Sequence, residues 1–197
     1  MGRGFHALYQ QDPQPAESAL FRREWFKIVD HLPADLDLVR FWDSAAKTSA
    51  RNDYTAGVLL GVTDEGQWFI ADVTRGRWEY PDARRMVLKT AVSDGDDVLI
   101  GIEDTSNGTA IVQDLLRDPA AAGLTIRAVK VLGDKLVRAG PWASLAQGGL
   151  VHLLRAEWNG RFLDECERFP LGAHDDQVDA VSGAHAMIAG MKRARFL

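Results

Sequence analysis

The sequence predicts one α/β domain built on a central mixed β-sheet that is flanked by helices. Its 197 residues, of which 46% are hydrophobic, can bury a core of ordinary size for one domain. From residue 38 onward, short apolar, β-rich runs alternate with segments of helical spacing. Three such runs precede the first helix. We therefore expect three antiparallel strands joined by short turns, and then parallel strands joined by helices.

The three leading strands are predicted over residues 38–45, 54–62 and 68–73, with a hairpin turn at Thr63-Asp64-Glu65-Gly66-Gln67. Further strands are predicted over 98–103, 125–132 and 150–154, and helices over 81–93, 107–117, 136–147, 158–168 and 176–189. Gly140-Pro141 interrupts one of these helices, so a loop followed by a short helix is the alternative there. This order of elements is the ribonuclease H-like arrangement, in which acids project from the first strand, the fourth strand and a late helix.

Residues 1–36 differ from the rest of the chain. The segment 9–15 is polar and broken by prolines, which is typical of an extended linker. Residues 21–29 offer a short helix or strand. We therefore expect a linker over 1–36 and the folded domain over 37–197.

Charge and cysteine content narrow the classes of function. The net charge of −5 argues mildly against a general nucleic-acid binder, but local basic clusters such as Arg75 and Arg77 decide phosphate contact. The single cysteine, Cys166, excludes an internal disulfide and fits a reducing compartment. No apolar run reaches the roughly 18 residues that a membrane helix needs.

Three carboxylates crowd the start of the last predicted helix, in His174-Asp175-Asp176-Gln177-Val178-Asp179-Ala180. Like charges this close repel, and a divalent metal ion is the simplest compensation. Asp176 and Asp179 are three residues apart and share a helix face, whereas Asp175 is suited to cap the helix. The alternative is an acidic helix start that is simply solvated.

Asp43 and Glu103 end two of the predicted strands, where a site in an α/β sheet forms. The alternatives are that Asp43 caps the following turn and that Glu103 marks where its strand meets water. Oxygen ligands without a Cys/His cluster favour Mg²⁺ or Mn²⁺. Two such ions, about 3.5–4 Å apart, can activate a water and stabilise the leaving oxygen in phosphodiester cleavage.

Six blocks, in order along the chain, resemble the C-terminal nuclease domain of the large terminase subunit of tailed bacteriophages. Among them are Phe41-Trp42-Asp43-Ser44-Ala45, Ile102-Glu103-Asp104, Gly133-Asp134-Lys135 and the acidic segment 174–180. The leader Leu8-Tyr9-Gln10-Gln11-Asp12-Pro13 is similar to the family's link between an ATPase motor and the nuclease. The chain carries no Gly-x-x-x-x-Gly-Lys-Ser/Thr loop, so we expect the motor domain to be missing from it.

The resemblance implies a metal-dependent DNA endonuclease that cuts concatemeric viral DNA during packaging, in the host cytoplasm, with two Mg²⁺ or Mn²⁺ ions. It suggests Asp43, Glu103 and Asp176 as the metal-binding acids, assisted by Asp179 or Asp175. The implied partners are double-stranded DNA, the ATPase domain, the small terminase subunit and the portal, with no membrane.

Lys135 and Arg138 are the candidates for phosphate contact, with a structural ion pair as the alternative for them. Two rival functions remain: another ribonuclease H-like nuclease, such as a junction resolvase or transposase, and a non-catalytic docking module for the motor or portal.

Overall fold

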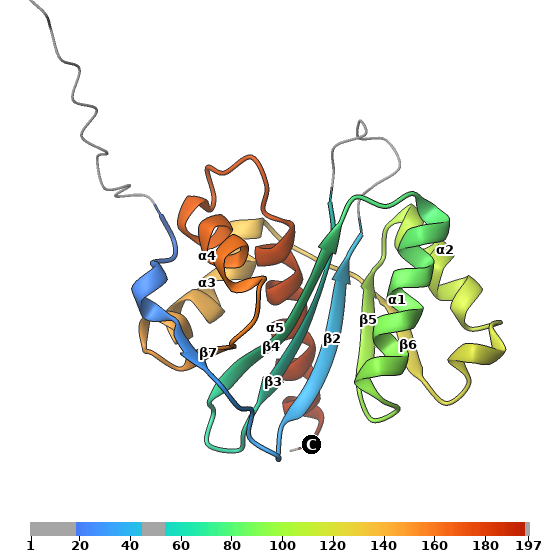
Figure 1. Cartoon of the computed structure of the whole chain (residues 1–197), viewed down its shortest axis with the longest axis horizontal. Coiled ribbons are helices and arrows are strands. Elements are labelled where there is room, and N and C mark those ends of the chain that lie inside the picture. Colours follow the sequence, from blue (N-terminus) through green and yellow to red (C-terminus); the bar gives the residue numbers. More distant parts are fainter. Residues whose placement is uncertain (1–18, 45–53, 196–197) are drawn as a thin grey trace, which may run out of the picture.

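A mixed β-sheet of seven strands is the centre of the computed structural model, which describes residues 19–44 and 54–195 (Figure 1). The strand order is β1-β7-β4-β3-β2-β5-β6. The strands are β1 (Lys27–Val29), β2 (Asp37–Asp43), β3 (Thr55–Val62), β4 (Trp68–Gly76), β5 (Leu99–Glu103), β6 (Thr125–Val129) and β7 (Val151–Leu154).

The strand directions bring several chain ends to one edge of the sheet. Strands β2, β3 and β4 pair antiparallel, whereas β5 and β6 run parallel to β2, and β7 and β1 run parallel to β4. The carboxyl ends of β2, β5 and β6 therefore meet at the same edge, together with the start of β3. The predicted sheet of three antiparallel strands followed by parallel strands is confirmed.

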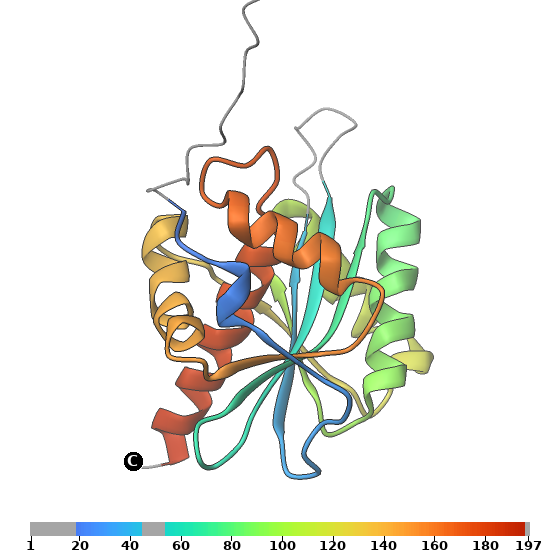
Figure 2. The same ribbon diagram turned by 60° about the vertical axis from the view of Figure 1, so that its left-hand side comes forward.

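The helices cover the two faces of the sheet unequally. Helices α1 (Tyr80–Asp94) and α2 (Ser106–Leu115) lie on one face, and α3 (Lys135–Gln147), α4 (Asn159–Arg168) and α5 (Asp176–Arg195) lie on the other (Figures 1 and 2). In α1, the residues Ala83, Val87 and Ala91 are buried at spacings of four, which explains how this helix packs. In the part of the chain that the structure describes, no helix is both long and apolar enough to cross a membrane.

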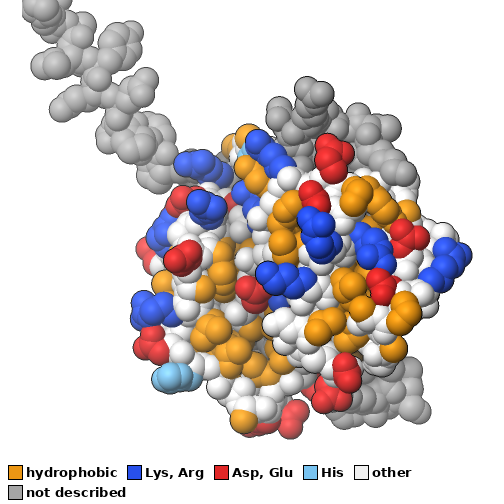
Figure 3. Space-filling view, turned by 45° about the vertical axis from the view of Figure 1, so that its right-hand side comes forward, with side chains coloured by type: hydrophobic (Ala, Val, Ile, Leu, Met, Phe, Trp, Pro, Cys, Tyr) orange, Lys and Arg blue, Asp and Glu red, His pale blue; other side chains and the backbone are white. Residues whose placement is uncertain are grey.

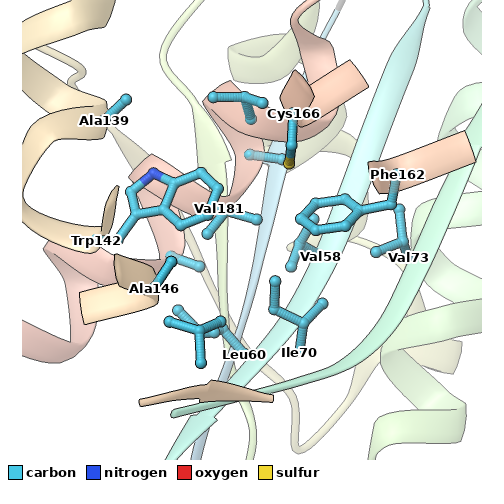
Figure 4. Close-up of a cluster of buried hydrophobic side chains, with 14 of the residues drawn as sticks. Val58, Leu60, Ile70, Val73, Ala139, Trp142, Ala146, Phe162, Cys166 and Val181 are labelled. Carbon is cyan, nitrogen blue, oxygen red and sulfur yellow. The ribbon is translucent and has the colours of Figure 1, made fainter. Parts of the chain in front are cut away.

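The larger core lies between the sheet and the helices α3, α4 and α5 (Figure 4). Trp142 of α3 and Phe162 of α4 pack over sheet residues such as Leu60 and Ile70. The indole Nε1 of Trp142 donates a hydrogen bond of 3.0 Å to Ser182 Oγ on α5, so the buried ring keeps its polar atom satisfied. This core fixes α5 against β2 and β3.

Helix α3 is continuous, so the alternative of a loop and a short helix is wrong. Pro141 lies inside it and removes one backbone hydrogen bond. Asp134 caps its start by accepting from Leu136 N at 2.8 Å, and the buried side chains Ala139, Trp142 and Ala146 hold its inner face. This packing offsets the lost hydrogen bond.

The segment before residue 37 contributes to the folded structure. The ring of Phe21 is 1% exposed and stacks on Trp142 with 4.0 Å between centroids, and β1 pairs with β7 (Figure 2). The packed structure therefore includes part of the predicted linker, because Phe21 and Phe26 complete the core between α3 and α4. The proline-broken segment 9–15 lies outside the described residues.

Candidate active site

Asp43 and Glu103 lie side by side at the ends of adjacent parallel strands. The register pairs Trp42 of β2 with Ile102 of β5, and the two acids are the next residues on each strand. Alternation along β2 places Asp43 on the same face as Phe41, and alternation along β5 places Glu103 on the same face as Gly101. Both acids therefore project toward the face that α5 covers.

Two glycines bring α5 close to these strand ends. A Cβ on Gly183 of α5 would overlap the ring of Phe41, and a Cβ on Gly101 of β5 would overlap the sulfur of Met187. Asp179, Gly183 and Met187 are spaced by four residues and form one stripe on the helix. The stripe runs over β2 and β5, so Asp179 lies one turn beyond Gly183, above the strand end that carries Asp43.

Burial and neighbouring carboxylates raise the pKa values of Asp43 and Asp179. Burial raises the pKa of Asp43 well above its ordinary value, and a hydrogen bond with Glu103 and the charges of Glu103, Asp179 and Asp176 raise it further. Burial also raises the pKa of Asp179 to about 6, against the opposing charge of Arg138. The predicted acids Asp43, Glu103, Asp176 and Asp179 are therefore brought together at one site.

Basic side chains contact the α5 acids from two directions. Arg75 of β4 lies 3.0 Å from Asp176, measured from Nη2 to Oδ2. Arg138 of α3 lies 2.9 Å from Asp179, measured from Nη2 to Oδ1.

The third basic residue, Lys135, contacts the carboxylate of Asp175. The ion-pair alternative for Lys135 and Arg138 thus describes the structure, while phosphate contact stays a prediction for both.

The donor set suits a hard divalent cation, although the side chains are not arranged around one. Among the described residues, no three acid, histidine or cysteine side chains stand at the spacing of a metal site. Asp176 and Asp179 are instead turned to Arg75 and Arg138. Asp43 and Glu103 lie close enough that they repel when both are ionised, and the resulting excess of negative charge is one that a cation would relieve.

Hydroxyl groups hold the two strand ends in register. Ser44 is buried, and its Oγ lies 2.7 Å from Thr105 Oγ1, which joins the residues that follow Asp43 and Glu103. Thr105 also caps α2 by accepting from Gly108 N at 3.1 Å. A Cβ on Gly108 would overlap the Glu103 carbonyl oxygen, so this position requires glycine.

Glu165 of α4 is a residue that sequence reasoning missed. Its carboxylate is buried and accepts hydrogen bonds at the start of α5, from Gln177 N at 2.6 Å, Gln177 Nε2 at 2.6 Å and Val178 N at 3.2 Å. Burial raises the pKa of Glu165, which these bonds and Arg75 partly counter. The sequence does contain a signal for this role: Glu165 lies three residues after Phe162, on the apolar side of the predicted helix, where an acid is expected to be buried and to need a hydrogen-bond donor.

The sheet order, together with acids at the ends of β2 and β5 and at the start of α5, defines a ribonuclease H-like α/β domain. The model of the terminase RNaseH-like domain family matches residues 40–188, which is most of the chain. The chain belongs to this family.

Solved structures support the same fold. The large terminase nuclease of thermophilic phage G20c with bound zinc is 18% identical with a TM-score of 0.62, over 86% of this chain and 96% of that one. The Mn-soaked terminase nuclease domain of human cytomegalovirus is 16% identical with a TM-score of 0.64, over 84% and 92%. The large terminase nuclease domain of Thermus phage P74-26 is 15% identical with a TM-score of 0.54, over 85% and 92%. No curated protein sequence matches the chain.

Proposed function

We propose that this domain is a metal-dependent DNA endonuclease that cuts concatemeric viral DNA during genome packaging. The observation that carries the proposal is the convergence of carboxylates from β2, β5 and α5, with the pKa values of Asp43 and Asp179 raised by burial and mutual repulsion. Keeping repelling acids together costs stability. A bound cation therefore explains the cluster better than a role in stabilising the fold does.

Divalent metal ions are the cofactor that fits these oxygen donors. The family relatives support this choice, because the G20c nuclease was crystallised with bound magnesium and the cytomegalovirus domain was soaked in manganese. We assign Asp43, Glu103 and Asp176 as ligands, with Asp179 or Asp175 assisting, to two Mg²⁺ or Mn²⁺ ions. When bound, the ions would supply an activated water and stabilise charge on the scissile phosphate.

The protein's own residues position the acids and balance their charge. The Ser44–Thr105 contact holds the ends of β2 and β5, and the Glu165 cap holds the first turn of α5. Lys135 and Arg138 neutralise α5 acids in the absence of DNA, and from this position they can reach backbone phosphates beside the cut. Within a terminase, the domain would act with an ATPase domain, a small subunit and a portal in the host cytoplasm.

Nicking of supercoiled plasmid in the presence of Mn²⁺ tests the proposal. We expect Asp43→Asn and Asp176→Asn each to lower the cleavage rate by at least about 100-fold while the domain stays folded, because each removes a metal ligand. Asp64→Asn is the matched control, since Asp64 is exposed in the turn between β3 and β4, at the other end of the sheet.

Two results would contradict the proposal. Cleavage that survives in both acid variants would show that Asp43 and Asp176 are not needed for the reaction. A wild-type domain that does not cut DNA with Mg²⁺ or Mn²⁺ would favour a non-catalytic docking module. Faster cleavage of four-way junctions than of linear duplex would favour a resolvase instead.

A further inference from the structure

A basic cleft of about 200 Å³ opens beside the candidate active site. Its charged lining comes from β4, α4 and the segment between α4 and α5: Arg75, Arg161, Asp164, Glu165, Arg168 and His174. Arg75 belongs to both places, because its guanidinium lines the cleft and also contacts Asp176. The cleft therefore adjoins the candidate active site at Asp176.

The acids of the cleft are already paired, whereas two of its arginines are not. Asp164 contacts Arg23, and Glu165 accepts from the first turn of α5. Arg161 and Arg168 are exposed and, among the described residues, have no ion-pair partner. Their positive charge is thus left for a ligand.

A stack of aromatic and guanidinium groups extends this positive charge along the sheet edge. The guanidinium carbon of Arg75 lies 3.6 Å from the ring centroid of Tyr54, and that of Arg77 lies 4.3 Å from it. The ring of His174 meets Tyr54 edge-on, with 5.0 Å between centroids. Stacking on an aromatic ring orients a guanidinium without neutralising it. Among the described residues Arg77 has no ion-pair partner, so its charge is left for an anion, whereas Arg75 shares its charge with Asp176 and Glu165.

We propose that Arg77, Arg75, Arg161 and Arg168, here called the basic tract, bind backbone phosphates of the DNA duplex next to the cut. Naming DNA as the ligand rests on the proposed function. The planar guanidinium fork suits phosphate oxygens, as it also suits carboxylates. Position favours phosphate here, because the tract meets the acids of the candidate active site at Arg75. Lys135 and Arg138 contact the acids from α3, so the tract adds a second phosphate-binding surface from β4 and α4.

Equilibrium binding to a labelled duplex, without metal and therefore without cleavage, tests the tract. The variant is Arg161→Gln/Arg168→Gln, and the charge-matched control is Lys89→Gln/Arg117→Gln. Lys89 and Arg117 are exposed on α1 and just after α2, and among the described residues neither has an ion-pair partner. The face on the α1 and α2 side carries basic and acidic side chains intermingled (Figure 3).

The expected result is a weaker salt dependence of the binding constant, measured by fluorescence anisotropy in EDTA. Each lost phosphate contact reduces the slope of log K against log salt by about 0.9, so the double variant should lose about 1.8. A slope of about 0.9 corresponds to about eightfold in affinity per contact for each tenfold change in salt. Arg77→Gln should lose about half as much slope as the double variant, and the control should bind as the wild type does.

The outcomes separate this proposal from the proposed function. A double variant with the control's affinity and salt slope would overturn the basic tract, even if plasmid nicking by the wild type still depended on Asp43. If the variant instead lost binding to a glutamate-rich peptide while duplex binding was unchanged, DNA would be the wrong ligand for the tract. Wild-type protein that neither binds nor cuts DNA would overturn both proposals.

Discussion

Replacing Asp179 with asparagine tests the electrostatic reasoning behind the site most directly. Asparagine keeps the shape of the side chain but removes the charge that burial and the neighbouring acids disfavour. If the metal-free site is a cluster of repelling carboxylates, Asp179→Asn should stabilise the protein. If the Arg138–Asp179 ion pair, 2.9 Å long, dominates, the same change should destabilise it.

The magnitude follows from the shifted pKa. Burial is the main cause that raises the pKa of Asp179 from 3.8 to about 6, with Asp175 and Glu103 adding to the rise and Arg138 opposing it. At about 1.4 kcal/mol per pKa unit, this shift corresponds to about 3 kcal/mol. Because the side chain is 17% exposed, solvent screening lowers the figure. We therefore expect a gain of about 1–3 kcal/mol at pH 8.

The sign of the pH dependence is fixed by the same shift. Between pH 3.8 and about 6, the folded state binds more protons at Asp179 than the unfolded state does. The free energy of unfolding therefore falls as the pH rises through this window and stays lower above it. The raised pKa of Asp43 acts in the same direction. The advantage of Asp179→Asn should be present at pH 8 and small at pH 4.

Urea denaturation in EDTA at pH 4 and pH 8 measures the effect, with Asp64→Asn as the exposed control. Adding excess Mn²⁺ at pH 8 should narrow the difference, because a bound ion stabilises the wild type by mass action and offsets the repulsion. A variant that is less stable than the wild type at pH 8 in EDTA would refute the reasoning. It would show that the ion pair with Arg138 outweighs burial and repulsion at Asp179.

Two further substitutions test how the site is held in place. Glu165→Ala should lower the free energy of unfolding by about 2 kcal/mol, because it leaves the start of α5 without its buried acceptor; Glu165→Gln should recover part of the loss, and equal stability of all three proteins in urea would contradict the capping role. Gly183→Ala should cost about 1–3 kcal/mol, because the added methyl group would overlap the Phe41 ring, and it should also slow plasmid nicking. The control is Gly190→Ala on the same helix, where the glycine is exposed with open space around it, so this variant should be as stable as the wild type or more stable. Equal stability of the Gly183→Ala and Gly190→Ala variants would contradict the role of the close contact with Phe41.

Most of the sheet could be predicted because its signal is local. Apolar, β-rich runs and the turn at residues 63–67 identify β3 and β4, and the helical spacing in 81–93 identifies α1. β1 was harder, because its three residues form a strand only by pairing with β7, more than 120 residues later in the chain. Phe21 and Phe26 are the sequence feature that indicates a folded segment, since two large aromatic side chains in a predicted linker are expected to be buried in a core.

In the candidate site, too, the features with a local sequence signal could be predicted and those that depend on distant residues could not. The acids stand out in the sequence because charges that end apolar strands or crowd a helix start need a local explanation. Their counter-charges do not stand out: Arg75 meets Asp176 across about a hundred positions, and nothing near either residue marks the partner. The glycines can be predicted only in part. Gly183 can be recognised as a position of close approach, but only the fold shows that it meets Phe41, two residues before Asp43. Because that contact sets the height of α5 above the strand ends, the site depends on a pair of residues that carry no charge.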